Sequence, residues 1–124
     1  PKGYQATESS FHNHLGNCYY MKKAYHEAQG QYIDALFRDQ NNPEYNFNLG
    51  RNQLANSDLA SAVYYLEIAE RNGQKDAQLY YLLGKAYKEN KESEKAKRML
   101  EEAVKLCKEP GLLEEIKKEL DNLK

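Results

Sequence analysis

The chain has 124 residues, of which 30% are charged, with 18 Lys and Arg against 19 Asp and Glu and a formal net charge of −1. This length fits one domain, and the balanced charge lacks the basic excess that is typical of nucleic-acid binding. No apolar run approaches the length that spans a membrane.

Helix signals recur along the chain. We expect helices, in chain order, at 9–22, 25–39, 43–55, 59–72, 77–89 and 93–108. Asn42-Pro43 is typical of a helix start, because Asn caps free backbone N–H groups and proline fits the first turn. Ser57 and Asp76 are expected to cap the fourth and fifth helices. Asn72-Gly73 indicates a helix end, where Gly supplies the left-handed residue.

A further helix is expected after Pro110. Leu113, Ile116, Leu120 and Leu123 fall on one side of such a helix, and charged residues occupy the rest, which makes it amphipathic. Earlier in the chain, Gly30 lies inside the second expected helix, where it costs about 1 kcal/mol relative to Ala. We expect it to mark a close contact between helices.

One pattern occurs three times at a constant spacing of 34 residues. Leu15-Gly16, Leu49-Gly50 and Leu83-Gly84 are each followed by two alanines at fixed distances, namely Ala28, Ala62 and Ala96, then Ala35, Ala69 and Ala103. Residues that are 34 apart are called a column below. A fixed period of this size indicates stacked helical repeats, whose usual role is binding rather than chemistry.

These columns resemble the tetratricopeptide repeat family. Tyr19 and Tyr87, three residues after their glycines, agree with the family pattern, and the resemblance extends from about Ser9 to Pro110. It departs from the family at the repeat end, where proline is replaced by Gln40, Gln74 and Lys108, and near the start of the first helix of each repeat, where His12, Asn46 and Tyr80 stand. The resemblance implies an all-α fold, a right-handed α-solenoid of helix–turn–helix repeats with about seven helices.

The expected organisation follows from this period. An N-terminal extension at 1–8 precedes three repeats at 9–42, 43–76 and 77–110, and a capping helix at 111–124 covers the apolar face of the last repeat. A dimerisation or partner helix is the alternative for this last segment.

The resemblance also implies a binding groove, because the first helices of successive repeats line a concave face in this family. The implied groove residues are Asn13, His14, Asn17, Tyr20, Phe47, Asn48, Arg51, Tyr81, Lys85 and Lys88. These columns carry cations, amides and aromatic rings, and none of these ten residues is acidic. Such a face suits a peptide or protein segment that bears carboxylate, which Arg and Lys attract while the amides bond its backbone. We therefore expect an adaptor or scaffold module.

Other functions remain open. Asn17, Asn48 and Lys85 are similar to part of the two-carboxylate clamp by which one subset of the family binds acidic chaperone tails, but Asn13 and Tyr81 stand where that clamp has lysines. The asparagines also fit a role as polar filler without function. Further alternatives are a structural spacer or self-associating segment of a longer repeat protein, and a second interface at Tyr64-Tyr65.

The sequence offers no site for chemistry. His12, His14 and His26 lack the spacing of metal ligands, the glycines form no phosphate loop, and no nucleophile–base arrangement is evident. We therefore expect no enzyme activity, cofactor, metal, nucleic-acid partner or membrane insertion. Cys18 and Cys107 belong to the first and third repeats, so we expect free thiols and a reducing, cytoplasmic location. Because the chain begins at Pro1, we expect a mature or excised fragment from which targeting information is missing.

Overall fold

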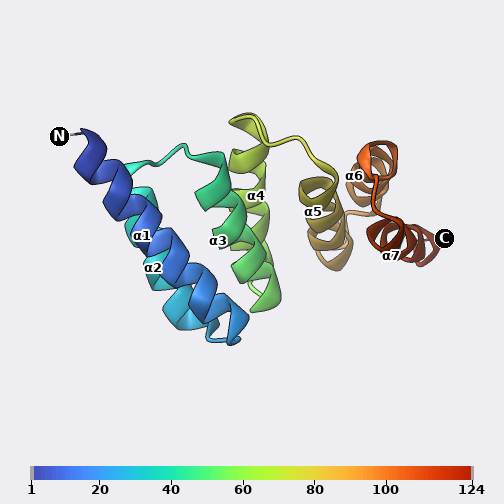
Figure 1. The fold of residues 1–124 in the computed structure, drawn as a ribbon. Coiled ribbons are helices and arrows are strands. Elements are labelled where there is room, and N and C mark those ends of the chain that lie inside the picture. Colours follow the sequence, from blue (N-terminus) through green and yellow to red (C-terminus); the bar gives the residue numbers. More distant parts are fainter. Residues whose placement is uncertain (1, 124) are drawn as a thin grey trace. The chain divides into compact units, whose positions relative to one another are not determined.

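The computed structural model describes residues 2–123, with side chains described from Thr7 to Leu123. Residues 2–123 form α-helices joined by short turns and contain no strand (Figure 1). The helices are α1 (Lys2–Met21), α2 (Tyr25–Arg38), α3 (Pro43–Ala55), α4 (Leu59–Arg71), α5 (Ala77–Glu89), α6 (Ser93–Leu106) and α7 (Pro110–Asp121). They divide into two compact units where one domain was expected: a first unit that ends at Gly73 and a second unit that begins at Gln74.

The helix boundaries agree with the prediction to within one residue except at three ends, one of which is the end of α7, at Asp121 rather than at 124. α1 begins at Lys2, so residues 2–8, which were expected to form an extension, continue the first helix. α6 ends at Leu106 rather than at 108, because Cys107 adopts an extended backbone with φ −78° and ψ 127°.

Capping side chains fix three of the helix starts. The Asn42 side chain accepts a hydrogen bond from the backbone N–H of Tyr45 at 3.0 Å, and that of Asp76 accepts one from Leu79 at 2.9 Å, as predicted. The prediction for α4 was wrong by one residue, since Asp58 rather than Ser57 accepts from the N–H of Ser61. Ser57 has a positive φ of 64° and forms the turn before the cap.

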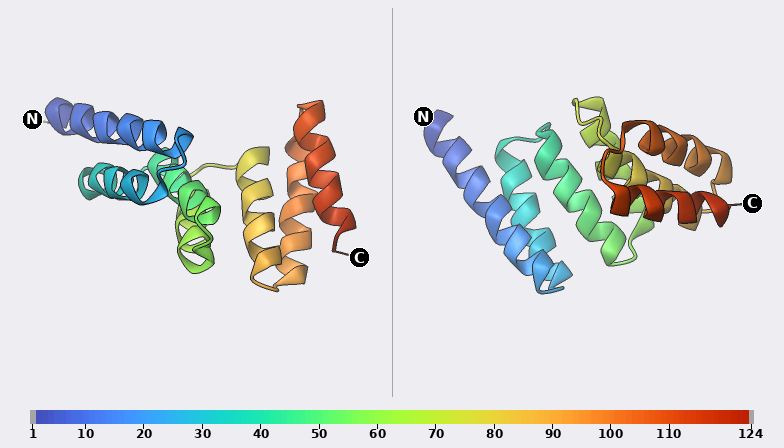
Figure 2. Two further views of the ribbon diagram at one scale, coloured as in Figure 1. Left: turned by 90° about the horizontal axis from the view of Figure 1, so that it is seen from below. Right: turned by 45° about the vertical axis from the view of Figure 1, so that its right-hand side comes forward.

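The first unit consists of two helix pairs, α1 with α2 and α3 with α4, and α2 also packs against α3. Figure 2 shows these helices from two sides. A Cβ atom added to Gly16 would lie 2.5 Å from the Tyr32 ring, and one on Gly50 would lie 2.7 Å from Leu66. Only glycine lets the paired helices approach this closely. The resulting core contains Ala28, Tyr32, Ala35, Leu36, Tyr45 and Leu49, with Tyr19, Tyr20 and Tyr65 packed around it.

The second unit pairs α5 with α6 in the same way, and α7 packs against α6. A Cβ atom on Gly84 would lie 2.6 Å from Leu100, so the glycine column has one steric cause in all three repeats. Ile116 of α7 is fully buried in a cluster with Tyr80, Leu100 and Ala103. The predicted apolar stripe of α7 needs one correction, because Leu112 rather than Leu113 joins Leu120 and Leu123 at this cluster.

Two smaller expectations have clear outcomes. Gly30 marks no close helix contact, since no described atom lies within 4 Å of the Cβ position, and nothing in the structure explains this glycine. Cys18 and Cys107 are free thiols, as predicted.

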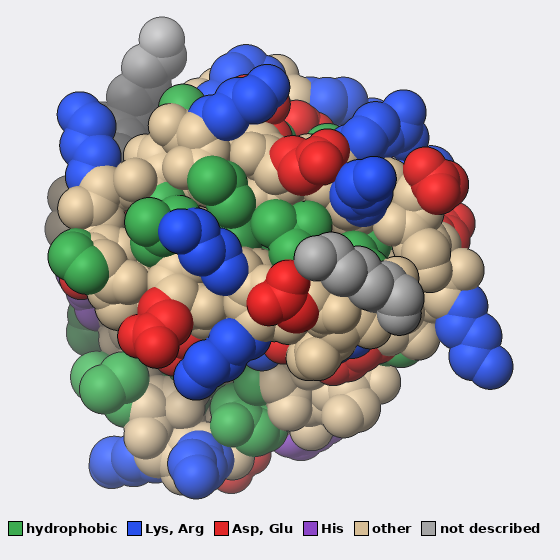
Figure 3. Space-filling model, turned by 90° about the vertical axis from the view of Figure 1, so that its right-hand side faces the viewer, with side chains coloured by type: hydrophobic (Ala, Val, Ile, Leu, Met, Phe, Trp, Pro, Cys, Tyr) green, Lys and Arg blue, Asp and Glu red, His purple; other side chains and the backbone are tan. Residues whose placement is uncertain are grey.

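On the face drawn in Figure 3, Lys and Arg side chains are interspersed with those of Asp and Glu, and hydrophobic side chains lie between them. In the part of the chain that the structure describes, no helix is both long enough and apolar enough to cross a membrane.

Candidate functional site

Four polar side chains predicted for the groove meet between α1 and α3 in the first unit. Asn48 donates from Nδ2 to Oδ1 of Asn13 at 2.9 Å, and Arg51 donates from a terminal guanidinium nitrogen to Oδ1 of Asn17 at 3.5 Å. These contacts join residues 35 and 34 positions apart, respectively. The repeat period therefore places equivalent surfaces of the two first helices beside each other. Asn13, Asn17, Asn48 and Arg51 are called the amide–arginine cluster below.

Aromatic rings surround the guanidinium of Arg51. Its central carbon lies 4.2 Å from the centroid of the Tyr20 ring and 5.8 Å from that of Phe47. These are distances at which a cation is attracted to a ring face. The Nε atom of Arg51 is buried without a hydrogen-bond partner. Among the described side chains, no carboxylate forms an ion pair with Arg51, so its positive charge is not neutralised within the first unit.

A buried hydroxyl on α2 donates a hydrogen bond to the cluster. Tyr32 of α2 is fully buried, and its hydroxyl donates to Oδ1 of Asn17 at 2.6 Å. Burial raises the pKa of the Tyr32 hydroxyl above its ordinary value, and the nearby guanidinium of Arg51 partly opposes this shift. The hydroxyl therefore keeps its proton at neutral pH and remains a hydrogen-bond donor.

The predicted groove residues of the second unit have different surroundings. Nζ of Lys85 lies 5.3 Å from the centroid of the Tyr81 ring. Nζ of Lys88 forms an ion pair with Oε2 of Glu119 on α7 at 2.6 Å. Burial raises the pKa of Tyr81, and the nearby carboxylates of Glu115 and Glu119 raise it further.

These carboxylates add acids to a face on which none of the predicted groove residues is acidic. The period predicts three repeats, whereas α7 extends the same columns by one more step. Glu115 follows Tyr81 by 34 residues, and Glu119 follows Lys85 by the same interval. The face of α5 and α7 is therefore mixed in charge, and Lys88 is already paired with an acid.

One predicted groove residue stands apart from the others. His14 is exposed and lines a shallow hollow on α1 together with Thr7, Ser10 and Phe11. It makes no described contact with the amide–arginine cluster.

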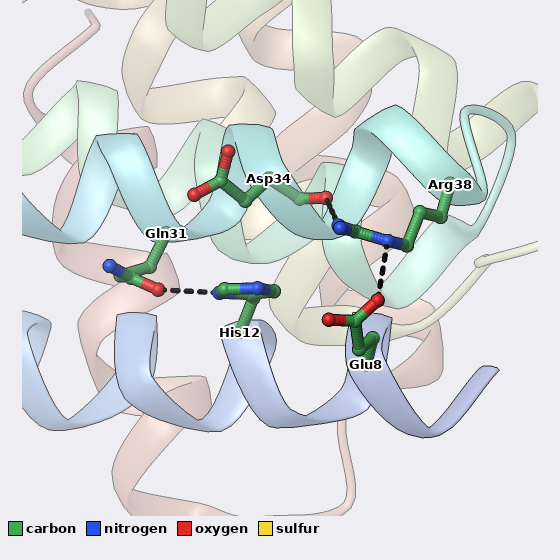
Figure 4. A network of polar contacts seen from close by, with 5 residues as sticks. All are labelled: Glu8, His12, Gln31, Asp34 and Arg38. Atoms are coloured by element: carbon green, nitrogen blue, oxygen red, sulfur yellow. Dashed lines mark hydrogen bonds and ion pairs between the residues drawn. The ribbon is translucent and has the colours of Figure 1, made fainter. Parts of the chain in front are cut away.

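Sequence reasoning missed a polar network between α1 and α2 (Figure 4). Glu8 pairs with Nε of Arg38 at 3.2 Å, and Arg38 also donates to the backbone carbonyl of Asp34 at 3.0 Å. Nδ1 of His12 lies 2.8 Å from Oε1 of Gln31, which fits a ring N–H that donates to the amide oxygen. The described residues contain no group of three or more His, Cys, Asp or Glu side chains that could hold a metal ion.

A cleft between α6 and α7 was also not predicted. Its volume is about 510 Å³, and it is lined by Ser93, Glu94, Lys97, Glu101, Lys117, Leu120, Asp121 and Leu123. Three acidic side chains and two lysines are among these residues, so the charge of the lining is mixed.

Tyr64 and Tyr65, which the sequence offered as a second interface, have different surroundings. Tyr65 packs against the core of the first unit, whereas Tyr64 is 59% exposed and meets the Tyr65 ring edge-on at 5.1 Å.

The sequence of the chain is similar to a known protein family and to a curated protein. A family model described as tetratricopeptide repeat matches residues 77–110. Among curated proteins, BBSome complex member BBS4 of Bos taurus is 35% identical over 96 residues. The match covers 77% of this chain but only 18% of the length of that relative.

Solved structures resemble the chain over nearly its whole length. The TPR domain of Arabidopsis OM64 has a TM-score of 0.89 at 20% identity and covers 97% of both chains. The first TPR of Spaghetti (RPAP3), bound to the HSP90 peptide SRMEEVD, has a TM-score of 0.84 at 21% identity and covers 95% of this chain and 94% of its own. The type III secretion chaperone SycD of Yersinia enterocolitica, in complex with a peptide of the translocator YopD, scores 0.81 at 15% identity over 92% and 90% of the two chains.

Proposed function

Because this chain is a tetratricopeptide repeat domain, we propose that it is a protein-binding module that takes a carboxylate-bearing peptide or protein segment on the first helices of its first unit. The observation that carries this proposal is Arg51. Its guanidinium lies over the Tyr20 ring, and the described residues supply no carboxylate to it. A guanidinium binds a carboxylate through short charge-assisted hydrogen bonds.

The surroundings of Arg51 support a peptide ligand. The partly exposed amide of Asn17 can bond a peptide backbone, and the partly exposed ring of Tyr20 offers apolar contact area. Asn13, Phe47 and Asn48 are themselves buried, with exposed fractions of 2%, 5% and 8%. Two structural neighbours were solved with peptides bound, one from HSP90 and one from YopD. Those peptides belong to the neighbours, and their presence on the same fold supports a peptide as the ligand of this chain.

The chaperone-tail alternative is less well supported. Asn13 stands where the clamp carries a lysine, and its Oδ1 accepts a hydrogen bond from Asn48, another clamp position. Two neutral amides that bond each other provide no charge for a second carboxylate. Charge-assisted hydrogen bonds contribute about 1.5–3 kcal/mol each, so the missing lysine removes a substantial part of the affinity of a double-carboxylate site.

The exposure of Phe11 favours a different class of function, that of a spacer or self-associating segment. Phe11 is 57% exposed, whereas Tyr45, in the same column of the second repeat, is 8% exposed because it packs in the core formed with α2. In a spacer or self-associating segment, Phe11 would be covered by another helix in the way that α2 covers Tyr45. Sedimentation over a concentration series tests this alternative: a monomer at every concentration argues against self-association.

Peptide selection tests the main proposal. Random peptides displayed with free C-termini are selected on the intact chain, and the best binder is synthesised and titrated into ¹⁵N-labelled protein. We expect amide shifts concentrated on α1 and α3 around Asn13, Asn17 and Arg51. Shifts confined to α2 and α4, or to α6 and α7, would contradict the proposed site.

A further inference from the structure

Tyr32 carries a hydroxyl that packing does not require. Its column holds Leu66 in the second repeat and Leu100 in the third, and all three side chains are fully buried under the glycine of their own repeat. An apolar side chain therefore fills this position in two of the three repeats. The first repeat differs by placing a polar atom there, and that atom reaches the side chain of Asn17 on α1.

The hydroxyl determines which way the Asn17 amide points. Oδ1 of Asn17 accepts from the Tyr32 hydroxyl at 2.6 Å and from Arg51 at 3.5 Å. A carbonyl oxygen accepts about two hydrogen bonds, so these donors occupy it. Nδ2 then carries two N–H groups to which the described residues offer no acceptor. Asn17 thus presents donors only, next to the uncompensated guanidinium of Arg51.

We infer that Tyr32 is a positioning residue that fixes Asn17 as a donor beside Arg51, and that this pair forms a subsite for a single carboxylate of the bound peptide. The inference rests on the proposed function and specifies the ligand chemistry of the same site. Without the hydroxyl, only the longer 3.5 Å contact from Arg51 holds the Asn17 oxygen. The amide then turns its oxygen toward the ligand more readily, where it would repel a carboxylate.

The neighbouring amides explain why the subsite takes only one carboxylate. Asn13 and Asn48 are bonded to each other at 2.9 Å, and both are neutral. His14 is exposed and lies apart from them, in the hollow with Phe11. The cluster therefore holds one cation, Arg51, and one anionic group of charge −1 balances it. A phosphate, with a charge of about −1.5 to −2 at neutral pH, would remain partly uncompensated.

The test uses the selected peptide in forms that differ in carboxylate number. The forms are an amidated peptide without acidic residues, the same peptide with a free C-terminus, the free acid with one added Asp, and an amidated form with one phosphoserine. We expect the first carboxylate to raise affinity by about tenfold or more, and the second to add less than about threefold. A second carboxylate that adds more than about tenfold, or a phosphoserine form that binds more tightly than the free acid, would overturn the single-carboxylate subsite.

The Tyr32→Phe variant tests the positioning role, because it keeps the ring under Gly16 and removes only the hydroxyl. We expect the free-acid peptide to bind about five- to tenfold more weakly and the amidated peptide to bind as before. A purely structural role would weaken both forms equally. The side-chain NH₂ signals of Asn17, followed by NMR, are expected to shift on addition of the free acid in the original chain and to shift less in Tyr32→Phe.

A second variant covers the case in which Tyr32→Phe does not fold. Asn17→Asp has nearly the same shape, but it replaces the donors by oxygens and pairs with Arg51, so it should abolish the preference for the free acid. If Tyr32→Phe and Asn17→Asp both keep this preference while Arg51→Glu removes binding, the inference is wrong and the proposed function stands. If no selected peptide depends on Arg51, the proposed function and this inference both fall.

Discussion

Nζ of Lys88 on α5 lies 2.6 Å from Oε2 of Glu119 on α7, and this ion pair ties the last helix to the third repeat. The two side chains are 29% and 21% exposed, so water and salt screen them only partly. The pair has a functional consequence, because it removes Lys88 from the cations available to an acidic ligand. We therefore expect the second unit to be a poorer anion site than the sequence suggested.

The ion pair predicts a measurable coupling. In a double-mutant cycle with Lys88→Met and Glu119→Gln, we expect a coupling energy of about 0.5–1 kcal/mol in the free energy of unfolding by urea, as is typical of a partly exposed pair. The coupling should shrink in high salt. A coupling indistinguishable from zero at low salt would mean that the pair does not hold α7.

The glycine column predicts opposite effects for two identical substitutions. In Gly50→Ala the new Cβ would lie 2.7 Å from Leu66, which is fully buried, so we expect a loss of about 1–3 kcal/mol in the free energy of unfolding. Gly30→Ala is the matched control, because no described atom lies near its Cβ position. We expect it to stabilise the chain by up to about 1 kcal/mol through helix propensity. Equal effects of the two variants would refute the steric explanation of the column.

Helix capping gives a third prediction. Asp76→Ala removes the acceptor for the Leu79 N–H at the start of α5 and should lower the free energy of unfolding by about 1 kcal/mol. Glu109 stands at the equivalent position before α7 but makes no side-chain capping bond. Glu109→Ala should therefore change stability by less than about 0.5 kcal/mol. Thermal or urea unfolding of both variants measures the difference.

Buried tyrosines predict a loss of stability in alkaline solution. Burial raises the pKa of Tyr32, Tyr45, Tyr65 and Tyr81 above the ordinary value of 10.0. The unfolded chain then loses these protons at lower pH than the folded chain. The stabilisation is fully present below pH 10 and is lost as pH rises through the folded pKa values. Urea unfolding at increasing pH should show this decline, and Tyr32→Phe should make it shallower. An unchanged slope in Tyr32→Phe would contradict the contribution of this residue.

The sequence was sufficient for those features that repeat locally. The 34-residue period predicted the helix pairs because Gly16, Gly50 and Gly84 each face a large side chain of their own repeat. This contact depends only on the two neighbouring helices of one repeat. The same period placed Asn17 and Arg51 in one column, and the structure brings them into contact. A signal for Glu115 and Glu119 is present as well, because both lie one further step of 34 residues along the columns. The prediction of α7 as a cap does not include these columns.

Other features of the site depend on directions that the period does not encode. Tyr32 occupies a column of leucines, and nothing in the pattern indicates that its hydroxyl reaches Asn17. Likewise, the period does not indicate that the side chains of Asn48 and Asn13 bond each other. The contact between Glu8 and Arg38 joins two helices through long side chains, whose rotamers depend on packing rather than on spacing.

The measurement that tests the central claim most directly is calorimetric titration of the selected acidic peptide into Arg51→Glu and Lys85→Glu. Both variants change the net charge equally and lie in the same column, and neither cation has a described ion pair with a carboxylate. They differ in their surroundings, because Arg51 lies beside the amide of Asn17, whereas Lys85 lies on the face of α5 and α7 that also carries Glu115 and Glu119. We predict that Arg51→Glu weakens binding by more than about thirtyfold and that Lys85→Glu weakens it by less than about threefold. Equal losses in the two variants, or a larger loss in Lys85→Glu, would contradict a carboxylate site in the first unit.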